Sequence, residues 1–72
     1  MKYSVVIPLK NEEGNIKELI DEVEPVMESL KEKWELICID DGSTDATLSI
    51  LEDLCRSKPF LRTIVFKENA LD

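Results

Sequence analysis

Apolar residues fall into three short runs, separated by two longer stretches with helical spacing. The runs are Tyr3 to Ile7, Trp34 to Ile39 and Leu61 to Phe66. Short runs without polar alternation are typical of parallel strands that are covered on both faces. We therefore predict three strands, and we expect Pro8 to end the first because proline offers no N–H to a neighbouring strand.

The two intervening stretches have the spacing of amphipathic helices. From about Glu13 to Lys33, apolar residues recur every three or four positions, and charged residues fall mostly on the opposite, solvent-exposed face. We expect Asn11 or Asn15 to cap this helix. Pro25 cannot donate a helical hydrogen bond, so we expect it to kink or divide the helix near Val23 and Glu24.

A second helix is predicted from about Asp45 to Ser57, with Ser43 or Thr44 as its cap; Lys67 to Asp72 is a polar tail. The order is then strand, helix, strand, helix, strand. Helix-length crossovers between buried strands indicate an α/β fold with a parallel three-stranded sheet in three layers. This is half of a Rossmann-like nucleotide-binding unit, in one domain spanning residues 1–72.

Polar side chains follow the first two strands at the point where each ends. Asp40 and Asp41 come directly after the second apolar run, and Asn11 and Glu12 lie in the loop after the first. The carboxyl ends of neighbouring parallel strands meet at one edge of the sheet, where ligands bind in such folds. Adjacent carboxylates repel each other unless a donor or cation lies between them, such as a nucleobase N–H, a ribose hydroxyl or a metal ion.

The same stretch has an ordinary structural interpretation. Asp-Gly is a turn dipeptide, and Ser43 is a suitable helix cap, so Asp41, Gly42 and Ser43 are also what a plain turn requires. A second aspartate is not explained by a turn. From residue chemistry alone, both a ligand site and a structural turn stay open.

Composition narrows the classes of function. The net charge is −7 with no histidine, which argues against binding nucleic acid through its phosphates and means that a phosphorylated ligand needs a bridging divalent metal. No Gly-rich phosphate loop follows the first strand. No apolar run approaches the roughly 20 residues of a membrane span, and there is no signal peptide, so we expect a cytoplasmic protein. Cys38 and Cys55 are expected to be buried free thiols.

Two patterns together carry a resemblance. Residues 5–16 read V-V-I-P-x-x-N-E-E-x-N-I and residues 40–47 read D-D-G-S-x-D-x-T. The pair resembles the opening of family 2 glycosyltransferases of the GT-A fold, and in particular the dolichyl- or polyprenyl-phosphate mannose and glucose synthases. The resemblance covers nearly the whole chain up to Phe66.

The resemblance implies a nucleotide site. In such enzymes the loop after the first strand, here with Pro8, Asn11 and Glu12, borders the nucleotide of a UDP- or GDP-sugar. The acids after the second strand, here Asp40 and Asp41, contact the base and ribose; Ser43 completes the set of candidate nucleotide-binding residues. Asp41 is the first candidate for the base N–H, and Glu12 the next.

The resemblance also implies what the chain lacks. The metal-binding D-x-D motif, the acceptor-binding half and the usual catalytic base lie later in such enzymes. We therefore expect no catalytic residue and no metal site here, weak nucleotide-sugar binding, and no transferase activity. Mg²⁺ or Mn²⁺ is expected in a full-length relative, which would work at the inner membrane face and use a lipid-phosphate or glycan acceptor.

Two further hypotheses compete with this one. A phosphoacceptor receiver domain is also acidic and parallel α/β, but its acidic pair follows the first strand and an aspartate ends its third, unlike here. The other is a structural module, since a three-stranded sheet has unpaired edges and uncovered helix faces. We therefore expect a homo-oligomer formed through a sheet edge or a helix face.

Overall fold

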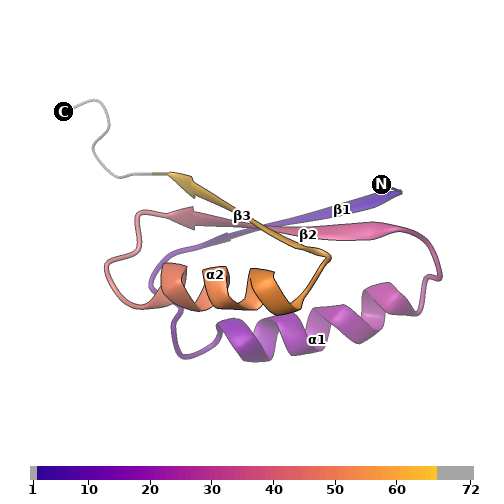
Figure 1. Ribbon diagram of the computed structural model, residues 1–72, viewed down its shortest axis with the longest axis horizontal. Helices are drawn as coiled ribbons and strands as arrows, with labels where there is room; N and C mark the ends of the chain where they lie inside the picture. Colours follow the sequence, from indigo (N-terminus) through magenta and orange to yellow (C-terminus); the bar gives the residue numbers. More distant parts are fainter. Residues whose placement is uncertain (1, 67–72) are drawn as a thin grey trace.

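The fold is a parallel α/β unit, in agreement with the sequence. The computed structural model describes residues 2–66, and the predicted polar tail Lys67 to Asp72 lies outside this range. The elements are, in chain order, β1 (Tyr3–Leu9), α1 (Ile16–Glu28), β2 (Trp34–Asp41), α2 (Thr47–Ser57) and β3 (Leu61–Phe66). The three strands are parallel and lie in the order β1-β2-β3 (Figure 1). The predicted fold class and element order are confirmed.

Both helices lie on the same face of the sheet (Figure 1). The chain moves to the next strand in the same direction at each crossover, and two crossovers of the usual right hand then place both helices on one side. Residues 2–66 therefore form two layers. The expectations of a third layer and of strands covered on both faces are wrong for this part of the chain.

The core lies between the sheet and the two helices. The register places Leu36 of β2 beside Val5 of β1 and Leu61 of β3. The residues with less than a tenth of their surface exposed are Leu9, Ile16, Ile20, Trp34, Leu36, Cys38, Asp40, Thr47, Leu51 and Leu61. Trp34 stacks on Phe60 with ring centroids 4.3 Å apart, which closes the amino-terminal end of this core.

The two cysteines are free, and they differ in burial. Cys38 is fully buried, as predicted, whereas Cys55 is half-buried. Burial, with a smaller contribution from Cys55, raises the pKa of the Cys38 thiol to about 11. Cys38 is therefore a small apolar core residue at neutral pH.

The first two strands are longer than predicted. β1 continues through Pro8 to Leu9, and β2 includes Asp40 and Asp41. Pro8 does not end β1 because β1 is an edge strand among the described residues, and an edge strand tolerates a missing N–H on its open side. The two acids consequently belong to β2 itself.

The first helix is shorter than predicted and is not divided. α1 begins at Ile16 rather than Glu13, and it continues through Pro25 to Glu28. Pro25 lies in the last turn, where its carbonyl still accepts the N–H of Ser29 at 3.1 Å. Lys31, with a left-handed φ of 55°, then turns the chain toward β2.

The predicted side-chain caps are also wrong. Asn15 immediately precedes α1 and Ala46 immediately precedes α2, and neither helix has a side-chain hydrogen bond from its cap residue. Asn11, Ser43 and Thr44 form hydrogen bonds between the two loops instead. Those bonds shape the candidate site described below.

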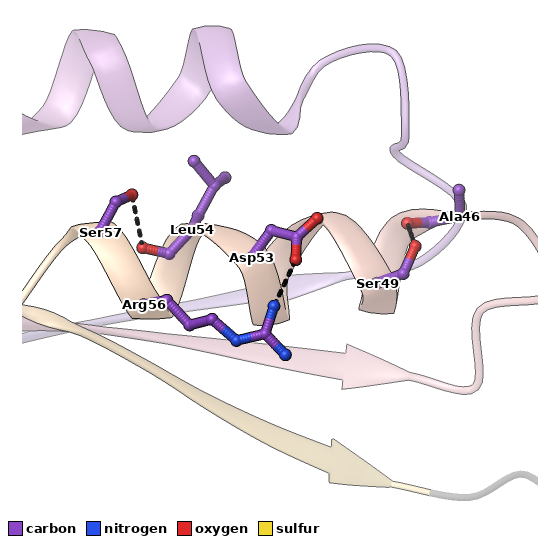
Figure 2. A network of polar contacts seen from close by, with 6 residues as sticks. All are labelled: Ala46, Ser49, Asp53, Leu54, Arg56 and Ser57. Carbon is purple, nitrogen blue, oxygen red and sulfur yellow. Dashed lines mark hydrogen bonds and ion pairs between the residues drawn. The ribbon is translucent and has the colours of Figure 1, made fainter.

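α2 buries Thr47 and Leu51, and it carries polar side chains on its exposed surface, several of which Figure 2 shows. Arg56 pairs with Asp53 at 2.6 Å, and the hydroxyls of Ser49 and Ser57 donate to backbone carbonyls one turn earlier. Leu54 points toward α1 in the same view. Just beyond α2, Lys58 Nζ lies 2.8 Å from Glu24 Oε1, which joins the two helices and raises the pKa of Lys58.

Two positions on α1 test this packing. Ile20 has 1% of its surface exposed and Val26 has 63%. We expect Ile20→Ala to lower the free energy of unfolding by roughly 2–5 kcal/mol, because it leaves a cavity against the sheet. The matched control Val26→Ala should change it by less than about 0.5 kcal/mol. Urea unfolding followed by the fluorescence of Trp34 measures both, and equal losses would contradict the assigned packing.

Candidate functional site

The loops after β1 and β2 meet at the carboxyl edge of the sheet (Figure 1). Leu9 at the end of β1 is in register with Asp40 near the end of β2. This placement follows from the parallel pairing, because both strands end on the same side. The predicted meeting of Asn11 and Glu12 with the residues after β2 is therefore observed.

Asn11 joins the two loops. Its backbone N–H donates to Ser43 Oγ at 2.9 Å, and its side-chain Oδ1 accepts the N–H of Thr44 at 2.8 Å. Asn11 has a left-handed φ of 54°, a conformation that asparagine tolerates better than most residues. Asn11 and Ser43 thus use polar groups to hold the loops together.

Thr47 forms the second half of this connection. It is fully buried, and its hydroxyl accepts the N–H of Glu12 at 2.8 Å while donating to Asp45 Oδ1. The carboxylate of Asp45 also accepts the N–H of Thr47 at 2.9 Å and that of Glu13 at 3.3 Å. The Glu13 carboxylate in turn accepts the N–H of Ala46 at 3.3 Å.

These bonds between residues 11–13 and residues 43–47 are called the loop clasp below. The sequence alone indicates no role for Thr47 and indicates Asp45 only as the start of a helix. The signal was present, because both residues lie within the pattern D-D-G-S-x-D-x-T. What the pattern alone does not reveal is that their partners lie more than 30 residues earlier in the chain.

Asp40 and Asp41 point to opposite faces of the sheet, since side chains alternate along a strand. Asp40 has 2% of its surface exposed, lies on the helix side and accepts the N–H of Ser43 at 3.3 Å. Asp41 is exposed and is in register with Phe66. The two carboxylates therefore do not face each other across a ligand-sized gap.

A hollow of about 340 Å³ opens beside the loop after β2. Its lining consists of Asp40, Gly42, Ser43, Thr44, Leu48, Val65 and Phe66. Gly42 has a φ of 74°, a backbone conformation that side chains disfavour. The hollow thus lies toward β3, and among the predicted residues Asp40 and Ser43 line it.

The other predicted residues surround this hollow without lining it. Pro8 and Asp41 are exposed at the strand ends, and Asn11 belongs to the loop clasp. Glu12 is half-buried, with its Oε2 3.5 Å from Asn15 Nδ2. The first loop therefore supports the loop after β2, and the carboxylates of Glu12 and Asp41 are the groups of this set that keep an acceptor toward solvent.

The edge is acidic and offers no ready metal centre. Across residues 2–66, no three Cys, Asp or Glu side chains gather closely enough to hold a metal ion. Over the same residues, neither helix has the length and apolar character needed to cross a membrane. The hydroxyl of Thr47, followed by backbone N–H groups, lowers the pKa of the Asp45 carboxyl below its usual value of 3.8.

Comparison with known proteins identifies the family. The family model described as glycosyl transferase family 2 matches residues 4–71. The chain belongs to glycosyltransferase family 2. The resemblance that the two sequence patterns indicated is thereby confirmed, and the receiver-domain hypothesis has no support.

Several curated relatives of this family 2 chain have a polyprenyl phosphate in their names. A dodecaprenyl-phosphate galacturonate synthase of Rhizobium johnstonii is 48% identical over 48 residues, which is 67% of this chain and 14% of that protein. An undecaprenyl-phosphate 4-deoxy-4-formamido-L-arabinose transferase of Salmonella choleraesuis is 44% identical over 50 residues, 69% of this chain and 15% of the relative. An uncharacterised glycosyltransferase of Bacillus subtilis is 36% identical over 69 residues, which is 96% of this chain and 21% of that protein.

The chain therefore spans about a seventh to a fifth of the length of these relatives. The family match over residues 4–71 includes both sequence patterns and the loop clasp. The family is established by these comparisons, and two of the named relatives are polyprenyl-phosphate sugar transferases. The acceptor, the sugar and the nucleotide of this chain are matters for a proposal.

Removing the Thr47 hydroxyl tests the loop clasp. Thr47→Val keeps the shape of the side chain but leaves the Glu12 N–H without its partner, which costs about 1–3 kcal/mol of stability. We expect faster amide hydrogen exchange at Glu12 in this variant. Thr47→Ser keeps the hydroxyl and should retain the protection of Glu12; equal protection in Thr47→Val and wild type would contradict the clasp.

The lowered pKa of Asp45 predicts a dependence on pH. A carboxyl with a lower pKa in the folded state than in the unfolded state stabilises the fold above its unfolded pKa. This contribution is therefore present at neutral pH and is lost as the pH falls below 3.8 toward the folded value. The difference in unfolding free energy between pH 7 and pH 3 should be smaller in Asp45→Asn than in wild type. Identical differences, measured by urea unfolding, would refute this role.

Proposed function

We propose that this chain is the nucleotide-recognition part of a family 2 glycosyltransferase that transfers a hexose from a UDP- or GDP-sugar to a lipid-phosphate or glycan acceptor. The single observation that carries the proposal is the carboxyl edge, where the loop clasp holds the loop that follows the exposed acid Asp41 against the loop that follows β1. Ligands of open parallel sheets bind at such edges. The names of the relatives support the lipid-phosphate acceptor.

The chemistry of the edge suits a nucleoside better than a phosphate. Asp41 and Glu12 are acceptors for the N–H of a base or for ribose hydroxyls. The hollow beside Gly42, with Leu48 and Val65 in its wall, provides an apolar surface on the Asp40 side of β2, whereas Asp41 is exposed on the opposite side. Asp40 acts indirectly in this proposal, since its carboxylate fixes the turn through the N–H of Ser43.

This edge offers few groups that could bind the diphosphate of a nucleotide-sugar. The acids outnumber the nearby cation Lys10, and the whole chain carries a net charge of −7. We therefore propose weak binding of nucleotide-sugars by these 72 residues, with Mg²⁺ or Mn²⁺ held in a full-length relative by residues outside them.

The residues of this edge accept hydrogen bonds and orient a nucleoside, but they supply no arrangement for displacement at a sugar carbon. We accordingly propose that the 72 residues bind without transferring sugar. Because the named relatives act on polyprenyl phosphates, the proposed place of work is the cytoplasmic face of a membrane.

Nucleotide titration tests this proposal. In ¹⁵N-labelled protein, UDP or GDP with Mg²⁺ should shift the amide resonances of residues 40–44. Asp41→Ala removes a charged acceptor and should weaken this binding roughly 10- to 100-fold, the equivalent of about 1.5–3 kcal/mol. Asp53→Ala, a control on the exposed side of α2, should bind as wild type does. Absence of shifts at these residues with both nucleotides would overturn the proposal.

A further inference from the structure

Acidic side chains of the chain itself occupy the amino end of α2. The first turn of a helix carries backbone N–H groups without intrahelical partners, and its partial positive charge makes it a common binding place for phosphate groups. In α2, the N–H of Ala46 donates to Glu13 Oε2 at 3.3 Å, and the N–H of Thr47 donates to Asp45 Oδ1 at 2.9 Å. Two carboxylates therefore lie where helices of other proteins hold a phosphate.

The two carboxylates come from different parts of the chain and hold each other in place. Asp45 lies just before α2, whereas Glu13 lies in the loop before α1, which passes beside the start of α2 (Figure 2). The N–H of Glu13 donates to Asp45 Oδ2 at 3.3 Å. Each carboxylate thus accepts a hydrogen bond from a backbone group at or next to the other acid.

Capping of the helix does not by itself explain this arrangement. One neutral acceptor, such as the hydroxyl of a serine or threonine, is enough to cap a helix. Here two charged groups converge from separate loops. The hydroxyl of Thr47 and backbone N–H groups lower the pKa of Asp45, which therefore stays ionised at neutral pH. An anion that approaches the amino end of α2 meets two negative charges and N–H groups that are already bonded.

We infer that Glu13 and Asp45 are specificity-determining residues, which keep phosphate groups away from the amino end of α2 and leave the neighbouring edge to the uncharged nucleoside part of a ligand. The inference rests on the proposed function for the identity of that ligand. Ser43 and Thr44, which line the hollow, directly precede Asp45, so the excluded position borders the proposed site. Repulsion of the wrong group is a common source of specificity. The diphosphate of a bound nucleotide then extends away from α2.

Inorganic pyrophosphate tests the exclusion without a nucleotide. Glu13 is exposed, so its variants should fold. Glu13→Gln keeps an acceptor for the N–H of Ala46 but removes one charge, and it should bind pyrophosphate about 3- to 10-fold more tightly than wild type. Glu13→Ala also releases this N–H and should bind at least as tightly as Glu13→Gln. Shifts of the amide resonances of Ala46 and Thr47 in ¹⁵N-labelled protein measure this affinity.

A matched control separates a local effect from a change in net charge. Glu52→Gln removes the same charge at an exposed position beyond the first turn of α2 and should bind pyrophosphate as wild type does. The gain in Glu13→Gln should also shrink as salt is added, because salt screens the repulsion. Equal pyrophosphate affinity in wild type and both Glu13 variants would overturn the inference, and so would an equal gain in Glu52→Gln.

Nucleosides separate this inference from the proposed function. Without Mg²⁺, uridine or guanosine should shift residues 40–44 with the same affinity in wild type and Glu13→Gln, whereas UDP or GDP should bind more tightly to Glu13→Gln. Unchanged affinity for UDP and GDP, with nucleoside binding present, would overturn the exclusion and leave the proposed function intact. If no nucleoside or nucleotide shifts these residues, the proposed function fails, and the pyrophosphate titration still decides whether Glu13 excludes phosphate.

Discussion

The buried hydroxyl of Thr47 is the contact on which the carboxyl edge depends. It accepts the backbone N–H of Glu12 and donates to Asp45, and so links the start of α2 to the loop that precedes α1. A backbone N–H that is buried without an acceptor lowers the stability of the fold. The Thr47 hydroxyl supplies the acceptor for the N–H of Glu12. With both loops fixed in this way, the orientation of the β2 end does not depend on a ligand. A site that is already formed loses less entropy when it binds.

The sheet illustrates how connectivity alone decides which faces are covered. Each crossover leads to the next strand in the same direction, so α1 and α2 share one face and leave the other to strands alone (Figure 1). The composition of β2 is consistent with two covered faces, because Leu36 and Cys38 meet the helices while Ile37 and Ile39 point away from them. The strand thus carries apolar side chains for a layer that residues 2–66 do not themselves supply.

Much of this was predictable from the sequence, and the exceptions have identifiable causes. Uninterrupted apolar runs such as Val5 to Ile7 predict the strands and their parallel pairing. The two sequence patterns, taken together, predict the family. The layers were mispredicted because an apolar run indicates which residues avoid water and not what covers them. Pro8 predicts the end of a strand and Pro25 a break in a helix. An edge strand and the last turn of a helix, however, both tolerate a missing backbone N–H.

The position of the candidate site was predictable from the sequence, but the separate roles of its residues were not. Asp40 and Asp41 are adjacent in sequence, and treating them as a pair ignored the alternation of a strand that extends through both. The capping roles assigned to Asn11, Ser43 and Thr44 failed for a similar reason. Their preferred partners are distant in sequence, and local propensity does not reveal a bond between residues 11 and 44.

The burial of Cys38 has a consequence for how the protein withstands oxidation. Oxidants and alkylating reagents attack the thiolate, and a thiol whose pKa is about 11 supplies almost none at neutral pH. The Cys38 thiol in the central strand β2 is therefore much less reactive toward oxidants at neutral pH than an exposed cysteine thiol. Of the two cysteines Cys55 is the more accessible, since it is half-buried, with its sulfur 3.1 Å from the Thr63 hydroxyl at the border between α2 and β3.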